Sequence, residues 1–252
     1  MSELYLIGEG RRNKIYRNGN TAIKMFVDSP QYKVEREAEL QRFAYEAGLP
    51  VPKIYGIRRI DSRTVALNME YIDGEIIANE SMNIEEMIHT INVLIELQKK
   101  VHAVNVKELS NMHEQLRMKL ERSKYIDDRY RKKMYEIVEK AKTEELALCH
   151  GDFHPLNILF DGSKYWIIDW AEATVGNRLV DICRSYLIQK SSGFEAVADY
   201  YVNTYCKGEC LDINEVLVFI PVLAAIRLEE NVTATERKRL EEIISAYLEE
   251  NM

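Results

Sequence analysis

The stretch C-H-G-D-F-H-P-L-N-I-L-F-D-G-S-K-Y-W-I-I-D-W, residues 149–170, contains the pattern from which the rest of the chain can be interpreted. Two apolar runs, Ile158 to Phe160 and Tyr165 to Ile168, are separated by a segment that begins with Asp-Gly. Apolar runs joined through such a turn are typical of a β-hairpin. We therefore expect a hairpin over residues 158–168.

Oxygen-bearing side chains lie at both ends of this predicted hairpin. Asp152 and Asn157 precede the first strand, and Asp169 follows the second. Because a hairpin fixes the distance between its two ends, we expect these side chains to converge. Two carboxylates and an amide suit a hard cation such as Mg²⁺, with one carboxylate left to orient a hydroxyl nucleophile.

The first 72 residues have the pattern of a small β-sheet with one helix. Asn18-Gly19 is a strong signal for a hairpin turn. Gly8 and Gly10 lie between the first two expected strands, where glycine lets backbone N–H groups approach a phosphate closely. The five expected strands are Leu4–Ile7, Lys14–Arg17, Thr21–Val27, Ile54–Ile60 and Thr64–Tyr71.

The sequence also predicts a buried ion pair in this region. A helix is expected from about Tyr32 to Ala47, where a glycine and two prolines stop it. Glu37 shares the apolar face of that helix with Val34 and Leu40. Since an ionised glutamate on a buried face needs a partner, Lys24 of the third strand is the expected one.

The loop His-Gly-Asp-x-x-x-x-Asn at residues 150–157, followed by Ile-Asp-Trp, resembles the aminoglycoside phosphotransferase and choline kinase family of kinase-like phosphotransferases. The resemblance implies that Asp152 is the catalytic acid/base and that Asn157 and Asp169 bind Mg²⁺. It also implies that His150 supports the loop. The resemblance also implies a structural role for His154, because the histidine at this position in the family mostly supports the loop.

The same resemblance implies a nucleotide site for ATP or GTP. Lys24, within Ala-Ile-Lys-Met, matches the strand lysine that holds the α- and β-phosphates. Met69 to Gly74 resembles the family's hinge, where adenine meets backbone groups. The residues expected to bind the nucleotide are Gly8, Gly10, Lys24, Glu37, Glu70 and Ile72.

The remainder of the chain is predicted to be mainly helical. Asp181 matches the family's structural aspartate, which is expected to brace the catalytic loop, and His102 is expected to have a packing or capping role. Helices are expected over Ile84 to about Val104, twice within residues 106–142, and near Gly193–Cys206, Asp212–Glu230 (kinked by Pro221) and Ala234–Glu249.

Composition excludes several classes of protein. The net charge of −7 across 252 residues argues against non-specific nucleic-acid binding and is compatible with a cationic acceptor. The longest apolar run, Val216 to Ile226, is too short to span a bilayer. Four sparse cysteines indicate neither a zinc site nor a disulfide framework. Together with a start that lacks signal-peptide features, these observations lead us to expect a cytoplasmic protein without membrane or nucleic-acid partners.

These inferences combine into one expectation. The fold class is α+β, a bilobal protein-kinase-like fold with a five-stranded antiparallel sheet and one helix in residues 1–72 and a larger, mainly helical lobe in residues 73–252. The expected activity is transfer of the γ-phosphate of ATP or GTP to a hydroxyl of an aminoglycoside-like or other amine-bearing acceptor. Candidates for contacting such an acceptor are Glu172, Glu229 and Glu230.

Alternatives remain for the substrate. Choline or ethanolamine, homoserine and sugars are acceptors of the same general architecture, and fold does not choose among them. A protein kinase is disfavoured because His154 stands where protein kinases have a lysine and Ile-Asp-Trp replaces Asp-Phe-Gly. A non-catalytic nucleotide-binding protein would usually have lost the lysine or one acid, and all are present. The sequence leaves the oligomeric state undetermined.

Overall fold

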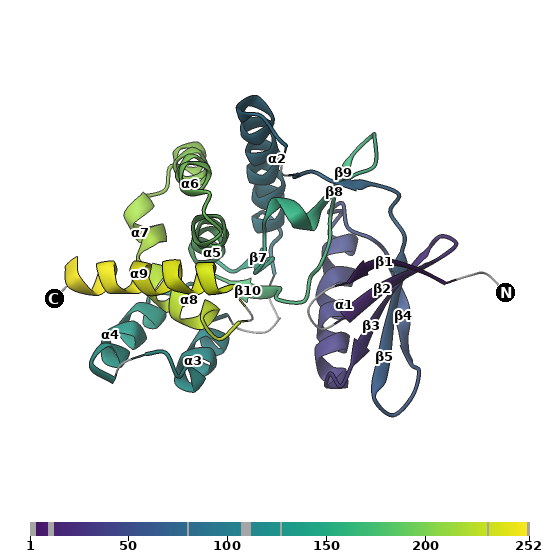
Figure 1. Ribbon diagram of the computed structural model, residues 1–252, viewed down its shortest axis with the longest axis horizontal. Coiled ribbons are helices and arrows are strands. Elements are labelled where there is room, and N and C mark those ends of the chain that lie inside the picture. The colour runs from purple at the N-terminus through teal and green to yellow at the C-terminus, as the bar shows by residue number, and fades with distance from the viewer. Residues whose placement is uncertain are drawn as a thin grey trace. The chain divides into compact units, whose positions relative to one another are not determined.

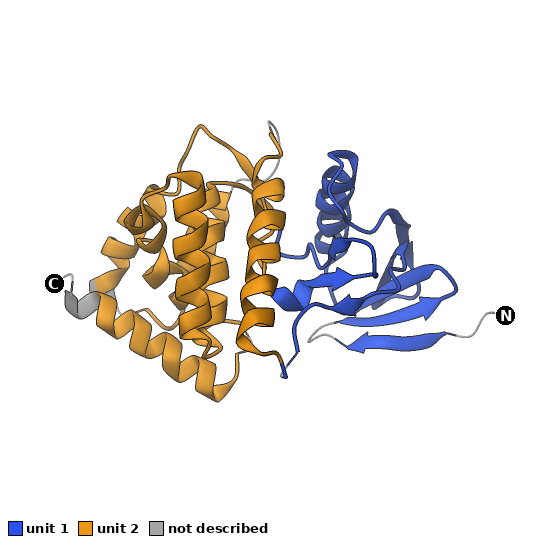
Figure 2. Cartoon of the chain, turned by 90° about the horizontal axis from the view of Figure 1, so that it is seen from above, with its two compact units in different colours: residues 1–81, 155–173 blue, residues 82–154, 174–252 orange. Residues whose placement is uncertain are grey.

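A computed structural model describes residues 4–9, 13–79, 81–106, 112–126, 128–230 and 232–250. The chain divides into two compact units, the first formed by residues 1–81 and 155–173 and the second by residues 82–154 and 174–252 (Figure 2). The chain therefore enters the second unit at residue 82, returns to the first at Pro155 and leaves it again after Ala173.

The first unit is built on an antiparallel sheet with strand order β1-β2-β3-β5-β4 (Figure 1). This confirms the predicted five-stranded sheet with one helix. The sheet and its helix have the following bounds: β1 (Tyr5–Glu9), β2 (Asn13–Asn18), β3 (Thr21–Val27), α1 (Gln31–Glu46), β4 (Ile54–Arg59) and β5 (Thr64–Glu70).

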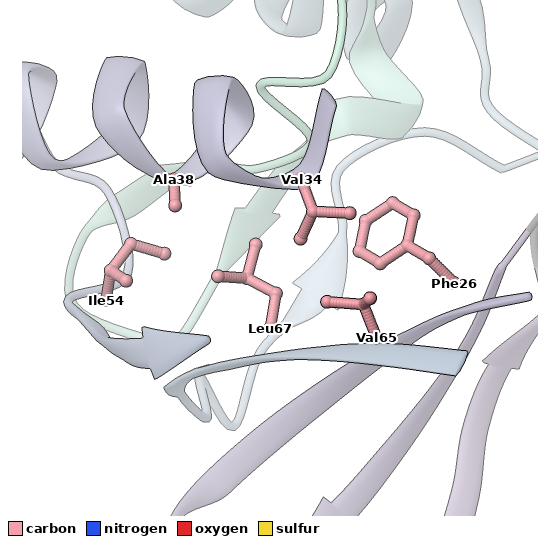
Figure 3. Packing of buried hydrophobic residues seen from close by; sticks show 6 residues of the cluster. All are labelled: Phe26, Val34, Ala38, Ile54, Val65 and Leu67. Atoms are coloured by element: carbon pink, nitrogen blue, oxygen red, sulfur yellow. The ribbon is translucent and has the colours of Figure 1, made fainter. Parts of the chain in front are cut away.

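Helix α1 covers one face of this sheet through a cluster of apolar side chains. Val34 and Ala38 project from the helix towards Phe26, Val65 and Leu67 on the strands (Figure 3). All of them are buried, and burial of a valine, leucine or phenylalanine side chain provides about 1.5–3 kcal/mol. The cluster packs α1 against β3 and β5, which brings Glu37, on the same buried side of the helix, next to the sheet.

A second, three-stranded sheet in the first unit has the order β6-β8-β9. Its elements are β6 (Glu75–Ile76), a 3₁₀ turn (Pro155–Asn157), β8 (Ile158–Phe160) and β9 (Tyr165–Ile167). Asp161 shapes the turn between β8 and β9 by accepting hydrogen bonds from the backbone N–H groups of Ser163 (2.8 Å) and Lys164 (2.9 Å) and from the indole of Trp166 (2.6 Å). The predicted hairpin is thus present, with its turn held by one carboxylate.

The compact units do not follow the boundary expected after residue 72. Glu75 pairs with Phe160 across β6 and β8, and the N–H of Ile167 donates to the carbonyl of Pro50 at 2.8 Å. These backbone hydrogen bonds join the hairpin to residues 1–81 of the first unit, although residues 82–154 separate the two segments in sequence. Pairing between segments so distant in sequence leaves no local signal.

The second unit is mainly helical. It contains α2 (Ile84–His102), α3 (Met112–Arg122), α4 (Asp128–Glu139), β7 (Ala147–Cys149), β10 (Thr174–Gly176), α5 (Arg178–Ser191), α6 (Glu195–Glu209), α7 (Ile213–Leu217), α8 (Ile220–Arg227) and α9 (Ala234–Glu250). Helix α2 begins at a capping box, in which Asn83 accepts from the N–H of Glu86 (3.0 Å) and the Glu86 carboxylate accepts from that of Asn83 (2.8 Å). None of the helices in the described ranges is long and apolar enough to cross a bilayer.

Two expectations about these helices need correction. The single kinked helix expected over Asp212–Glu230 is two helices, α7 and α8. Pro221 lies in the first turn of α8, where its missing N–H breaks no helical hydrogen bond. In addition, α5 was not predicted. Asn177 caps it by accepting from the N–H of Leu179 at 2.9 Å.

Candidate active site

The first unit contains an ion cluster centred on Lys24. Side chains alternate along β3, so Ala22, Lys24 and Phe26 point to the face covered by α1. The Nζ atom of Lys24 donates to the Glu37 carboxylate at 2.7 Å and to the Asp169 carboxylate at 2.8 Å. The predicted Lys24–Glu37 pair is therefore formed, and it includes the acid that follows the hairpin.

The cluster is asymmetric in its exposure to solvent. Glu37 is 3% exposed, whereas 43% of the Asp169 side chain is exposed. Burial on its own would lower the pKa of Lys24, but the charges of Glu37 and Asp169 outweigh it and raise that pKa. Lys24 is thus an ammonium ion that bonds the buried Glu37 carboxylate and the partly exposed Asp169 carboxylate.

The hairpin places Asn157 and Asp169 at neighbouring positions. Ile158 pairs with Ile167, and the N–H of Ile168 donates to the carbonyl of Asn157 at 3.0 Å. Asp169 follows directly, with a backbone φ of 62°. The end of the hairpin therefore holds the amide-bearing residue beside the carboxylate-bearing one, as the sequence predicts.

The chemistry of these two side chains fits Mg²⁺. Asn157 offers an amide oxygen and Asp169 carboxylate oxygens, and Mg²⁺ prefers oxygen ligands. The carboxylate is exposed in part, which would allow phosphate oxygens and water to complete the octahedral shell that Mg²⁺ requires.

The predicted catalytic residue, Asp152, lies on a loop of the second unit. Its backbone N–H donates to Nδ1 of His150 at 3.3 Å, and its carboxylate is 3.5 Å from Nε2 of His154. Burial would raise the pKa of Asp152, but the hydrogen bond and charge of His154, together with the charges of Arg184 and His150, hold it well below the usual value. Asp152 is therefore ionised at neutral pH and can accept a proton.

Asp181, in the first turn of α5, braces this loop. Its carboxylate accepts from the N–H groups of Gly151 (2.8 Å) and His150 (3.3 Å), from Gln98 (3.1 Å) and from Nε2 of His102 (2.9 Å). His102 is thus a structural residue whose other ring nitrogen contacts the hydroxyl of Tyr205 at 2.8 Å. The predicted bracing role of Asp181 corresponds to these contacts.

The other nucleotide-site candidates have less distinctive environments. Gly8 lies in β1 opposite Ile15, and Gly10 lies outside the described residues. The N–H of Glu70, at the end of β5, donates to the carbonyl of Lys53 at 2.8 Å, and Ile72 is buried just beyond. Backbone recognition at these positions stays a prediction.

Two of the acidic residues considered for the acceptor already have partners. Glu229 accepts from the backbone N–H of Lys124 at 2.6 Å, and Glu230 forms ion pairs with Arg184 and Arg227. Glu172 lies exposed in the first unit, and its charge acts on Arg36. Arg184 was missed by the sequence analysis. The signal for it is an arginine placed between the apolar pairs Ile182-Cys183 and Tyr186-Leu187 of α5.

Comparison with known proteins agrees with this arrangement. The sequence model of the phosphotransferase enzyme family matches residues 4–212. A curated protein, "Protein LicA homolog" of Mycoplasma capricolum subsp. capricolum (strain California kid), is 23% identical over 239 residues, which cover 92% of this chain and 94% of that protein.

Solved structures are similar over nearly the whole chain. A thermostable mutant of an aminoglycoside phosphotransferase, in ternary complex with AMP-PNP and hygromycin B, has a TM-score of 0.70 at 13% identity and covers 98% of this chain and 94% of its own. A choline/ethanolamine kinase family protein from Mesorhizobium loti has a TM-score of 0.66 at 18% identity and covers 98% and 87%. At these identities the likeness establishes the kinase-like fold.

Proposed function

This chain belongs to the phosphotransferase enzyme family, and from that premise we propose that it transfers the γ-phosphoryl group of ATP or GTP to a hydroxyl group of a small amine-bearing acceptor. The observation that carries the proposal is the Lys24 ammonium, which bonds Glu37 at 2.7 Å and Asp169 at 2.8 Å. A nucleoside triphosphate and its metal need a fixed lysine for the phosphates and an accessible aspartate for the metal. Lys24 is held by the buried Glu37, and Asp169 beside it is partly exposed.

In this proposal the first unit binds the nucleotide. Lys24 contacts the phosphates, and Glu37 keeps its ammonium in place. Asn157 and Asp169 would hold Mg²⁺, which neutralises charge on the phosphate oxygens. Backbone groups near Glu70 and Ile72 would meet the base, and Gly8 with Gly10 would approach the phosphates.

Asp152 acts on the acceptor. Its carboxylate orients the acceptor hydroxyl and takes its proton as the new oxygen–phosphorus bond forms. The bond between the γ-phosphorus and the bridging oxygen breaks, and the nucleoside diphosphate leaves. Since the positive groups around Asp152 keep it ionised, it is ready for this role throughout the neutral range.

Two kinds of observation support the acceptor class. The chain has a net charge of −7, and structural neighbours include an aminoglycoside phosphotransferase with hygromycin B and a choline/ethanolamine kinase family protein. Both names imply acceptors that carry an amine or a quaternary ammonium group. The favoured acceptor is therefore an aminoglycoside-like compound, with choline or ethanolamine as the second candidate.

A panel assay tests the proposal. Nucleoside diphosphate release is measured with Mg²⁺ and ATP, or Mg²⁺ and GTP, in the presence of kanamycin, hygromycin B, choline, ethanolamine, homoserine, thiamine or glucose. We expect release that depends on an amine-bearing acceptor. Release with glucose alone would contradict the acceptor class. No transfer to any acceptor by a protein that binds Mg²⁺–ATP would contradict the assignment as an active kinase.

A further inference from the structure

Helix α5 carries a buried arginine, Arg184, about one turn beyond Asp181. Arg184 is only 8% exposed, and a buried guanidinium requires hydrogen-bonding partners. Its Nε atom donates to the carbonyl of Gly151, and its terminal nitrogen pairs with Glu230 at 2.8 Å. Residues three apart lie on the same face of a helix, so Asp181 and Arg184 approach the loop together.

These two side chains form hydrogen bonds to the peptide groups on both sides of Gly151. Asp181 accepts from the Gly151 N–H at 2.8 Å, and Arg184 donates to the Gly151 carbonyl. Gly151 has a φ of 78°, a conformation that favours glycine. The carbonyl that Arg184 contacts belongs to the peptide group that also contains the N–H of Asp152, so its orientation fixes where the Asp152 side chain begins.

We propose that Arg184 is a positioning residue for the reaction: its bond to the Gly151 carbonyl fixes the peptide that carries Asp152, and Glu230 holds the guanidinium in that orientation. The inference deepens the proposed function, because it rests on the role of Asp152 as the base.

The setting of Glu230 supports this role. Glu230 also pairs with Arg227 at 3.1 Å, and Arg227 in turn contacts Glu236 at 3.2 Å and the hydroxyl of Ser191 at 3.3 Å. Charges therefore alternate from Arg184 through Glu230 and Arg227 to Glu236. These ion pairs link the orientation of Arg184, through Glu230, to Arg227 of α8 and Glu236 of α9.

Arg184 also affects Asp152 through its charge. Burial raises the pKa of the Asp152 carboxyl, whereas the hydrogen bond and charge of His154 and the charges of Arg184 and His150 lower it. The net effect is a lowered pKa. Removing Arg184 would loosen the Gly151–Asp152 peptide and take away one of these positive charges. Both changes would affect turnover, whereas the nucleotide-binding residues of the first unit would be unaltered.

Four variants test the proposal. Arg184→Met removes the guanidinium and keeps an unbranched side chain. Arg184→Lys keeps the positive charge but has one nitrogen in place of the two that contact Gly151 and Glu230. Glu230→Gln keeps the size of the side chain and removes the negative charge that faces Arg184 and Arg227. Arg117→Met is the matched control, because Arg117 pairs with Glu121 at 3.3 Å on the exposed surface of α3.

The steady-state experiment measures kcat and the KM for ATP with the best acceptor of the panel. For Arg184→Met we expect kcat to fall about 10²-fold, the loss typical of a catalytic group displaced by about 1 Å, with the KM for ATP unchanged. Arg184→Lys and Glu230→Gln should lose less. Equal kcat values for Arg184→Met and Arg117→Met would overturn the proposal. If Arg184→Met fails to fold, the comparison of Arg184→Lys and Glu230→Gln with Arg117→Met decides in the same way.

Amide hydrogen exchange separates this inference from the proposed function. Exchange over residues 147–157 is measured in the same proteins without nucleotide, and we expect faster exchange in Arg184→Met and Glu230→Gln than in Arg117→Met. If the wild-type protein transfers phosphate to no acceptor, the proposed function fails while exchange still reports whether Arg184 orders the loop. Unchanged exchange in that case would overturn the inference as well.

Discussion

Asp169 is held in a conformation that few side chains adopt. Its φ of 62° lies in the left-handed region, which aspartate tolerates better than most residues other than glycine. This backbone geometry places one carboxylate oxygen 2.8 Å from Nζ of Lys24 while 43% of the side chain stays exposed. Uncommon backbone conformations of this kind concentrate at functional sites.

Replacing Asp169 tests the metal assignment. Asp169→Asn keeps the size of the side chain but removes the charge, so we expect Mg²⁺ to lose its effect on ATP binding. Titration calorimetry with ATP, with and without Mg²⁺, measures this. Glu39→Gln, an exposed change on α1, is the control. ATP binding that still depends on Mg²⁺ in Asp169→Asn would refute the assignment.

Replacing Lys24 tests both binding and stability. Lys24→Met leaves Glu37 buried without its ammonium partner, and loss of one member of a buried pair costs about 3–5 kcal/mol. We expect weaker ATP binding and a lower free energy of unfolding in urea. Adding Glu37→Gln should restore part of the stability, because no buried charge then remains, but not the ATP binding. Wild-type ATP affinity in Lys24→Met would contradict the proposed role.

At the scale of elements, the sequence predicts the helices and strands in which buried and exposed residues alternate with the helical or strand period. Glu37 could be paired with Lys24 in advance because it shares a helix face with Val34 and Leu40, and all three side chains are buried. Helix α5 escaped prediction because nearly every residue in it is buried, which erases the helical period. The contact of Arg184 with Gly151 depends on tertiary packing and has no local signal.

The packing of α1 on its sheet gives a prediction at this scale. Leu67 is fully buried in the cluster beneath the helix, and removing such a side chain costs about 2–5 kcal/mol. We expect Leu67→Ala to lower the free energy of unfolding by this amount and to weaken ATP binding, since α1 carries Glu37. Val27→Ala, an exposed change on β3, should stay within about 0.5 kcal/mol of the wild type. Equal stability of the two variants would show that the cluster does not anchor α1.

At the scale of the whole molecule, the chain returns to its first unit after the Asp152 loop. Residues 155–173 contribute the hairpin to a unit whose other residues come from positions 1–81. The sequence contains the strands and the turn of this hairpin. Its association with β6 and Pro50 joins Phe160 to Glu75, 85 residues earlier (160 − 75), and Ile167 to Pro50, 117 residues earlier (167 − 50), and no short-range pattern specifies such pairs.

Stability of the molecule should depend on pH through Asp181. Burial would raise the pKa of Asp181, but hydrogen bonds from His102, Gln98 and Gly151 and the charge of His102 lower it below the usual 3.8. A depressed pKa in the folded state contributes stability above about pH 4, and this contribution is lost as the pH falls through the folded-state pKa. We therefore expect Asp181→Asn to be less stable than the wild type at pH 7.

Urea unfolding of both proteins between pH 3 and 8 measures this effect. The difference in free energy of unfolding between the wild type and Asp181→Asn should be largest above about pH 4 and shrink below it. Asp199→Asn, another aspartate of the second unit, is the control. A difference that grows as the pH falls would mean that Asp181 is not stabilised in its ionised form.

The most direct test of phosphoryl transfer follows the reaction by ³¹P NMR with Mg²⁺, ATP and the best acceptor of the panel. The wild type should produce ADP and a phosphorylated acceptor. Asp152→Asn should bind Mg²⁺–ATP as tightly as the wild type but form product about 10²–10⁴-fold more slowly, as expected for the loss of a general base. Product formation by Asp152→Asn at the wild-type rate would contradict the account.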